Sequence, residues 1–539
     1  MYQIYVDRFC NGNPDNDVET GEYMYLGDKS IRVTDWYQYP ASMDVREFYG
    51  GDLQGVMRKL DYLQELGVDV IYFNPIFVSP SNHKYDTQDY DYVDPHIAVI
   101  KNDGGNLLQG WEGNNCSAGK YRLRTTDKEN LEASNEYLAE LIREVHKRGM
   151  KIILDGVFNH CGSFNKWMDR EYIYHNVEGY EPGAYISSKS PYRNYFNFYS
   201  RESENWPDND NYEGWWGHNT LPKLNYEQSQ ELEDYIINVG RKWVSEPFCA
   251  DGWRLDVADE LPDVFLDALR RAAKAEKADA LVLGEVWEDA SNKYSYGLRR
   301  RYLLGDQLDS VMNYPFANAV LSFLRSGSSD GFFDTILSIV EHYPPQVLHL
   351  LMNHIGTHDT PRALTALAGE EANGRGREWQ SGRMLSPEQR ARGLKLMRLA
   401  TAIQYTLPGV PSIYYGDEAG MEGYGDPFNR GCYPWGQEDR ELLAWYHRLG
   451  MVRRACPALA DGEFEPVWSE GGMIAFARNK GSDRILTVIN RGDYDYTYAL
   501  PYDWRAAKGL MGVMPWEGCL TMPPLSCAVL GLGGWMEQV

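Results

Sequence analysis

The chain has 539 residues, of which 43% are apolar and 24% charged, a composition typical of a globular protein with one large domain and at least one smaller one. Its formal net charge of −25 and the lack of any run of about 18 apolar residues argue against nucleic acid, an anionic membrane surface or a membrane span. The start, MYQIYVDRFC, shows no basic leader, and eight irregularly spaced cysteines form neither a disulfide framework nor a CxxC metal pattern, so we expect a reducing cytoplasm.

Short apolar runs, each ending in a polar or acidic residue, predict parallel strands that are buried on both faces. In chain order these runs are 68–75, 150–160, 280–287, 350–359 and 409–418. Helical patterns separate them. For example, Leu138, Ile142 and Val145 fall on one face of a helix that ends at Gly149.

A repeated strand and helix leaves two architectures open, a (β/α)8 barrel and a doubly wound sheet. Polar residues stand at the carboxyl ends of several different strands, where barrel enzymes build their active sites. No GxGxxG motif follows the first strand, which weakens the dinucleotide-binding alternative. We therefore predict an α/β fold, a (β/α)8 TIM barrel.

Two stretches do not fit a bare barrel. The stretch from about 160 to 226 is rich in aromatic residues, Asn, Gly and Pro, and predicts a folded excursion after the third strand. After about residue 455 the helical period stops, and the sequence alternates and turns like antiparallel strands. We predict a barrel over 1–160 and 227–455, an inserted domain over 161–226 and a C-terminal β-sandwich domain over 456–539.

Three carboxylates at predicted strand ends are candidates for chemistry. In GWRLDVADE (252–260), Arg254 and Asp256 share one face of a strand, so Arg254 is expected to keep Asp256 ionised. Glu285 follows the apolar ALVLG, where desolvation favours the protonated form. Asp359 ends a later strand. One acid and one nucleophile are what retaining glycoside hydrolysis needs.

Each signal also has an ordinary structural explanation. An isolated Arg-x-Asp at a strand end is more often a structural ion pair. A single Glu there is equally compatible with a structural and a catalytic role. Asp359 is placed to cap a helix, since Thr360 and Pro361 follow it. Three such carboxylates on nearby strands together favour an active site.

Four motifs occur in this order: DGVFNH (155–160), GWRLDVADE (252–260), GEVW (284–287) and NHIGTHD (353–359). With them the sequence resembles the α-amylase family, glycoside hydrolase family 13, over nearly its whole length. The resemblance implies that Asp256 is the nucleophile, that Glu285 is the general acid/base, and that Asp359 binds sugar hydroxyls and helps to distort the ring.

The same resemblance implies a set of substrate contacts. Arg254, His160 and His358 are expected to hold the sugar at the cleavage point, and Tyr85 is expected to stack beneath it. The segments YFNPIF (72–77), SPSNHKYDT (79–87) and LPKLN (221–225) are similar to the neopullulanase, cyclomaltodextrinase and maltogenic amylase group. This similarity adds Asn82, Trp287, Glu260, Asp426 and Arg430 as expected contacts.

One of these positions has an alternative structural role, and other positions carry residue types that differ from related enzymes. Arg430 is equally compatible with a structural ion pair. Lys223 stands where exo-acting 1,6-glucosidases typically have Asp, whereas Asp259 stands where the group usually has Asn. The group also carries a β domain before the barrel, and here MYQIYVDRF already reads as the first barrel strand, so we expect that domain to be missing.

The resemblance further implies a calcium site, because NGNPDND (11–17) and YGGDL (49–53) are similar to the group's calcium loop. The alternative is a turn without metal. The family's other calcium site usually takes a His where Glu260 stands, so it is not expected here. The implied Ca²⁺ ligands are Asn11, Asn13, Asn16, Asp17, the carbonyl of Gly50, and Asp52.

We therefore expect a retaining hydrolase of starch-derived α-glucans, such as maltooligosaccharides, cyclodextrins or pullulan. It would cleave α-1,4 bonds, and α-1,6 cleavage stays open. An α-glucosidase or a glucanotransferase of the same family is the alternative. A non-catalytic glycan-binding homologue is a remote one, because such relatives are expected to lose the three carboxylates. The expected partner is the glucan itself, with no nucleic acid and no membrane, as a monomer or a homodimer.

Overall fold

The computed structural model describes residues 1–110, 112–199 and 211–538, and its centre is a ring of parallel strands. Neighbouring strands pair in the order of the chain, and the last pairs with the first. A parallel bridge between Met312 and Met352 joins the remaining two, so the ring is closed. This confirms the predicted (β/α)8 barrel. The eight strands within the described residues are β1 (Tyr2–Ile4), β6 (Val70–Phe73), β9 (Lys151–Gly156), β10 (Gly252–Leu255), β11 (Leu281–Gly284), β14 (Ser310–Val311), β15 (Met352–His354) and β16 (Val410–Tyr414).

Helices surround the strands, and local sequence sets their ends. Asp127 caps the helix that was predicted to end at Gly149 by accepting from the Asn130 N–H, and the helix stops just before Gly149, whose φ is +73°. Its buried face carries Leu138, Ile142 and Val145, as predicted. The helices are α1 (Leu53–Arg58), α2 (Leu60–Glu65), α3 (Gly119–Thr126), α4 (Lys128–Lys147), α5 (Gln230–Val244), α6 (Asp263–Glu276), α7 (Tyr314–Ser326), α8 (Phe332–His342), α9 (Pro345–Leu348), α10 (Ala363–Ala368), α11 (Arg377–Gln380), α12 (Pro387–Thr406), α13 (Arg440–Ala455) and α14 (Pro457–Asp461). Among these described residues no helix is both long and apolar enough to cross a bilayer.

The excursion after β9 returns to the point where it leaves the barrel. Backbone bonds run from Cys161 N to the Pro222 carbonyl (3.0 Å) and from Ser163 N to the Thr220 carbonyl (3.0 Å). Phe164 of this excursion packs in a small core with Tyr23 and Tyr121, so loops from the first two barrel units support it. The bounds 161–226 stay a prediction, and residues 200–210 lie outside the described residues. Short strands in these loops are β2 (Met24–Tyr25), β3 (Asp28–Lys29), β4 (Ile31–Arg32), β5 (Glu47–Phe48), β7 (Phe77–Val78), β8 (Asp89–Val93), β12 (Tyr294–Ser295) and β13 (Leu298–Arg299).

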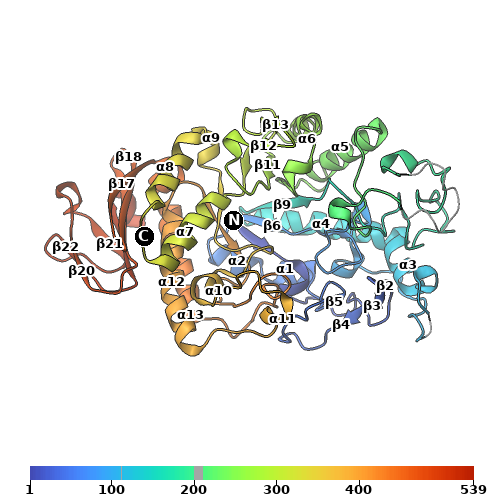
Figure 1. Cartoon of the computed structure of the whole chain (residues 1–539), viewed down its shortest axis with the longest axis horizontal. Coiled ribbons are helices and arrows are strands. Elements are labelled where there is room, and N and C mark those ends of the chain that lie inside the picture. The colour runs from blue at the N-terminus through green and yellow to red at the C-terminus, as the bar shows by residue number, and fades with distance from the viewer. Residues whose placement is uncertain (111, 200–210, 539) are drawn as a thin grey trace.

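An antiparallel sheet closes the chain, as predicted, and lies at the left of Figure 1 beside α12. It contacts the barrel through buried polar groups: Thr487 donates to Thr406 Oγ1 (3.0 Å), and Arg478 donates to the Thr406 carbonyl (3.2 Å). These bonds fix the sheet against the end of α12. In order across the sheet the strands are β17 (Glu463–Glu470), β18 (Met473–Lys480), β19 (Asp483–Asn490), β23 (Ser526–Leu532) and β21 (Lys508–Gly512), with a separate pair β20 (Tyr496–Ala499) and β22 (Cys519–Met522).

Candidate active site

A cavity of about 390 Å³ lies at the carboxyl ends of the barrel strands. Asp256 directly follows β10, Glu285 directly follows β11, and Asp359 comes from the loop after β15. Because carboxyl ends of parallel strands meet at one rim, these three carboxylates line one cavity. The other predicted contacts that line it are Tyr85, His160, Trp287, His358, Asp426 and Arg430.

One buried guanidinium connects the carboxylates. Arg254 Nη1 lies 2.8 Å from Asp256 Oδ1 and 2.9 Å from Asp155 Oδ1, and Nη2 lies 2.8 Å from Glu285 Oε2. Arg254 itself is fully buried. A single positive charge thus faces three carboxyl groups.

This arrangement corrects the expectation that Arg254 keeps Asp256 ionised. Burial raises the pKa of Asp256 well above its usual range, and the charges of Glu285 and Asp155 raise it further, while Arg254 opposes them. The sequence argument considered one neighbour and neglected burial and the other two carboxylates. One guanidinium among three buried carboxyl groups favours a proton shared within the cluster, and retaining hydrolysis needs one such proton.

Two donors fix the Glu285 carboxyl group. The Val257 N–H donates to Oε2 (2.8 Å), and the Trp287 indole N–H donates to Oε1 (3.1 Å). Trp287 in turn stacks on Tyr314, with ring centres 4.2 Å apart. Val257 has a φ of 40°, a left-handed conformation that is rare for a β-branched residue and costs about 1–3 kcal/mol.

A flat aromatic surface forms another part of the cavity wall. The rings of Tyr85 and His358 stack with centres 5.1 Å apart and planes within 4°. The Tyr85 hydroxyl donates to Asp155 (2.8 Å), which also binds Arg254. Tyr85 therefore presents a fixed ring, as a sugar-stacking residue must.

The histidines of the site are neutral. Burial lowers the pKa of His358 well below its usual range, with Arg430 and Arg254 adding to the effect, and burial lowers the pKa of His160 to about 4. The Gln3 amide lies 2.9 Å from His358 Nδ1, and Asp359 Oδ2 lies 3.1 Å from Nε2. If the Gln3 amide donates to Nδ1, the proton of the neutral ring is on Nε2 and is directed at Asp359.

Asp359 and Arg430 form a further charged group. Burial, with the charge of Glu285, raises the pKa of Asp359 to about 7, and Arg430 opposes this shift from 3.7 Å. Arg430 also pairs with Asp426 at 2.7 Å while it lines the cavity. The two alternatives for Arg430, ion pair and cavity wall, therefore coexist.

The structure places two predicted contacts elsewhere. The Asn82 amide donates to the backbone carbonyls of Asp44 (2.6 Å) and Glu47 (3.0 Å) and accepts from Tyr5 (2.7 Å), so Asn82 supports a loop and does not line the cavity. Glu260 lines a different hollow of about 280 Å³, where Lys223 lies 3.4 Å away. Asp259 accepts from Tyr302 (2.6 Å) and lines neither hollow.

Sequence reasoning missed several residues of the site. Asp155 binds Arg254 beneath the cavity, and a carboxylate inside the buried run IILDG was a detectable signal. Trp215 stacks on His160 with ring centres 4.8 Å apart, and the unusual pair WW in EGWWGHN was its signal. Trp216, the second residue of that pair, also lines the cavity, as do His83 and Val45, which no comparable local pattern marks.

The predicted calcium ligands are gathered only in part. Asp17 accepts from Asn11 (3.0 Å), Gly50 lies against both side chains, and the Asn16 Oδ1 is buried with no hydrogen-bond donor among the described residues. Arg32 lies 2.6 Å from the other Asp17 oxygen, which a cation would have to share. These oxygen donors suit Ca²⁺.

The last two predicted ligands have other partners. Both Asp52 oxygens accept backbone N–H groups, from Gly12, Asn13 and Gly55, so this carboxylate caps α1. Asn13 accepts from the Asp15 N–H at 3.3 Å in an exposed turn. Both side chains thus already have backbone partners in this structure.

Comparison with known proteins gives a consistent result. Residues 3–102 and 133–440 match the model of the alpha-amylase catalytic domain. The cyclomaltodextrinase of Geobacillus thermopakistaniensis (strain MAS1) is 32% identical over 99% of this chain and 77% of its own length. The amylopullulanase of Thermoanaerobacter thermohydrosulfuricus is 34% identical over 92% of this chain, which spans only 33% of that relative.

Solved structures show the same architecture. The type III pullulan hydrolase from Thermococcus kodakarensis superimposes with a TM-score of 0.76 at 29% identity, covering 98% of this chain and 81% of its own. The cyclic alpha-maltosyl-(1→6)-maltose hydrolase from Arthrobacter globiformis gives a TM-score of 0.74 at 25% identity, covering 99% and 98%.

Proposed function

The chain belongs to the alpha-amylase family and is a glycoside hydrolase, and from this premise we propose that it cleaves α-1,4-glucosidic bonds of starch-derived oligosaccharides with retention of configuration. One observation carries the proposal. Asp256 lies 2.8 Å from Nη1 of the Arg254 guanidinium, and Glu285 lies 2.8 Å from Nη2 of the same group. A guanidinium is short, so the two carboxyl groups are close neighbours, as the separation of roughly 5–5.5 Å in retaining glycosidases requires.

The reaction uses the proton that the carboxyl cluster holds. Glu285 gives this proton to the glycosidic oxygen while Asp256 attacks the anomeric carbon and forms a glycosyl ester. Glu285 then takes a proton from water, and the water oxygen displaces Asp256 from the sugar. Two inversions leave the product in the α configuration.

The remaining residues bind and orient the sugar. The Tyr85 ring offers an apolar face to a pyranose ring. Asp359, His358 and His160 supply hydrogen-bond partners around it, and the neutral histidines avoid adding charge beside the developing oxocarbenium ion. Arg430 and Asp426 close the cavity next to Asp359.

Product analysis tests this function. We expect maltotriose, pullulan and β-cyclodextrin to be cleaved, with α-anomers as first products in proton NMR and panose from pullulan. Glucose released from one end of maltotriose, with the other two substrates untouched, would indicate an α-glucosidase. β-Anomers as first products would rule out retention, and no cleavage of any of the three would reject the proposal.

We further propose that Ca²⁺ binds to Asn11, Asn16, Asp17 and the carbonyl of Gly50. The buried, unpaired Asn16 oxygen supports this, because a cation would satisfy it. The ion would cross-link the 11–17 loop to the Gly50 turn and stabilise the fold, without taking part in bond cleavage.

We also propose a cytoplasmic location. All eight cysteines are free thiols, and five of them are buried. Free buried thiols fit a reducing compartment.

A further inference from the structure

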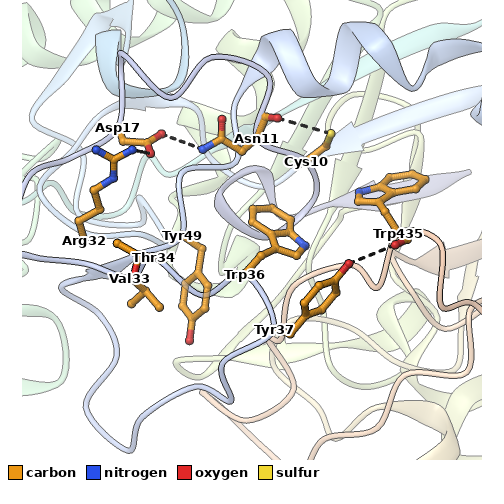
Figure 2. Close-up of a pocket in the computed structure, with 10 residues that line it drawn as sticks. All are labelled: Cys10, Asn11, Asp17, Arg32, Val33, Thr34, Trp36, Tyr37, Tyr49 and Trp435. Carbon is orange, nitrogen blue, oxygen red and sulfur yellow. Dashed lines mark hydrogen bonds and ion pairs between the residues drawn. The ribbon is translucent and has the colours of Figure 1, made fainter.

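A second pocket of about 410 Å³ lies outside the catalytic cavity (Figure 2). Figure 2 shows the polar side chains of Arg32, Asp17 and Asn11 toward one end of it and the rings of Trp36, Tyr37 and Trp435 toward the other. Aromatic rings beside hydrogen-bonding groups are what a sugar needs, because a pyranose has apolar C–H faces and a rim of hydroxyl groups.

The aromatic end of this pocket is fixed in position. The Trp36 indole donates to the Tyr433 carbonyl (2.9 Å), and the Trp435 indole donates to the Phe9 carbonyl (2.6 Å). The Tyr37 hydroxyl donates to the Trp435 carbonyl (3.1 Å), while 53% of Tyr37 stays exposed. A ligand therefore meets rings that are already ordered, which lowers the entropy cost of binding.

The polar end offers hydrogen-bonding groups. Arg32 and Asp17 pair at 2.6 Å, and Asp17 is also one of the proposed Ca²⁺ ligands. Thr34, which is exposed, adds a hydroxyl group to the lining. Sugar hydroxyls can accept from Arg32 and can both donate to and accept from Thr34, groups that the proposed Ca²⁺ does not use.

The second pocket lies directly behind the wall of the catalytic cavity. The buried Arg8 guanidinium lies 4.3 Å from the ring of Tyr49, which lines the second pocket. The same group donates to the carbonyl of Arg430 (2.6 Å), which lines the catalytic cavity. Two segments contribute to both cavities: Val45 and Arg430 line the catalytic cavity, and Tyr49 and Trp435 line the second pocket. The wall between them is therefore about one side chain thick at Arg8.

We propose that this second pocket is a non-catalytic binding site for a neutral α-glucan segment. This inference rests on the proposed function, because that function puts α-glucans in contact with the protein. The ligand class is a short maltooligosaccharide or the end of a longer chain, stacked on Trp36 and Tyr37.

Stoichiometry of binding tests the proposal. The probe is maltotriose, titrated calorimetrically into the Glu285→Gln protein, which should not consume it, with calcium at one saturating concentration. We expect two molecules bound per chain. Adding Tyr37→Ala or Trp36→Ala should leave one, with affinity at the second site reduced at least tenfold. Adding Tyr85→Ala should remove the other site.

Controls separate the possible failures. Tyr502→Ala removes a more exposed ring (86%) from the 3-10 turn Tyr502–Trp504, which lies outside both pockets, and should leave two sites. The melting temperature shows whether each variant folds. If Trp36→Ala does not fold, Tyr37→Ala still tests the proposal, because Tyr37 is exposed and its loss should not disturb the fold. One site in Glu285→Gln, or two unchanged sites in Tyr37→Ala, would overturn the proposal. If the wild-type protein cleaves α-glucans but Glu285→Gln binds only one maltotriose, this inference fails and the proposed function stands.

Discussion

Arg254 and Asp155 form a 2.9 Å ion pair in which both side chains are completely buried. Asp155 does not line the catalytic cavity, but it also accepts the hydroxyls of Tyr72 (2.7 Å) and Tyr85 (2.8 Å). This carboxylate therefore holds in place both the guanidinium that binds the catalytic pair and the ring beneath the sugar. It is a positioning residue.

Asp155→Asn should lower kcat about 10- to 100-fold with a smaller change in KM. Because the charge of Asp155 raises the pKa of Asp256, its removal should also move the acid limb of the pH–rate profile to lower pH. The matched control is Asp251→Asn, which breaks a buried ion pair to Lys277 at the amino end of β10. A similar loss of melting temperature in both variants, with kcat and pH profile unchanged in Asp155→Asn, would contradict a positioning role.

Glu285→Gln should abolish hydrolysis and keep binding, since the amide has the shape of the carboxyl group and cannot give up a proton. General acid–base catalysis contributes about 10²- to 10⁴-fold, and we expect kcat to fall by at least that factor. Single-turnover assays and calorimetry measure the two properties separately. Glu288→Gln, at an exposed position nearby (64%), is the control and should behave as wild type. Wild-type rates in Glu285→Gln would show that Glu285 is not the general acid/base.

Two substitutions of Tyr85 separate its ring from its hydroxyl. Tyr85→Phe keeps the stack on His358 and loses the bond to Asp155, so we expect a loss in kcat/KM of about tenfold or less. Tyr85→Ala loses the sugar-stacking face as well and should cost a further tenfold or more, mainly in KM. Steady-state kinetics on maltotriose gives both values. Equal losses in the two variants would show that the ring does not contact substrate.

Asp359 should make the wild-type protein less stable as pH rises. Its pKa is about 7 when folded and about 3.9 in an unfolded chain. Between these values the folded state keeps a proton that the unfolded state has lost, so stability present below about pH 4 declines until about pH 7.

The variant Asp359→Asn does not titrate, so it should gain melting temperature relative to wild type between pH 5 and 7.5. With 32% of the Asp359 side chain exposed, water screens part of the effect, and we expect about 1 kcal/mol at the upper pH. Thermal unfolding at the two pH values measures this. An equal difference in melting temperature between Asp359→Asn and wild type at pH 5 and at pH 7.5 would show that the Asp359 pKa is not raised in the folded protein.

Removal of calcium should lower the melting temperature by a few degrees. A ligand at about 100 times its Kd stabilises the folded state by about 2.7 kcal/mol. The effect should disappear in Asp17→Ala and persist in Asn13→Ala, because the structure directs Asn13 to its own turn. Differential scanning calorimetry with and without chelator, together with metal analysis, makes the measurement. An unchanged melting temperature after chelation, together with no metal in the analysis, would show that the 11–17 loop binds no Ca²⁺.

The barrel was predictable because its signals are local. Apolar runs and helical periods are read within about 20 residues, and each strand end then carries its polar residue to the same rim. The strand β14 escaped prediction, because it has only two residues, Ser310 and Val311, and no apolar run marks it.

Interactions between distant segments were not predictable in the same way. Asn82 is held by the carbonyls of residues 44 and 47, and no local pattern identifies such partners. The charge state of Asp256 depends on Asp155, about a hundred residues earlier in the chain, and on burial that only the closed barrel creates. The second pocket likewise joins residues 10–49 to Trp435.

Val257 shows what the fold gives up for its active site. Its left-handed backbone, which is strained for a β-branched residue, aims the N–H at Glu285. The most stable version of this barrel is therefore not the native one. Selection of variants for heat resistance alone would favour an unstrained backbone at residue 257. Such a backbone would turn the N–H away from Glu285 and lower activity, so stability and activity must be selected together.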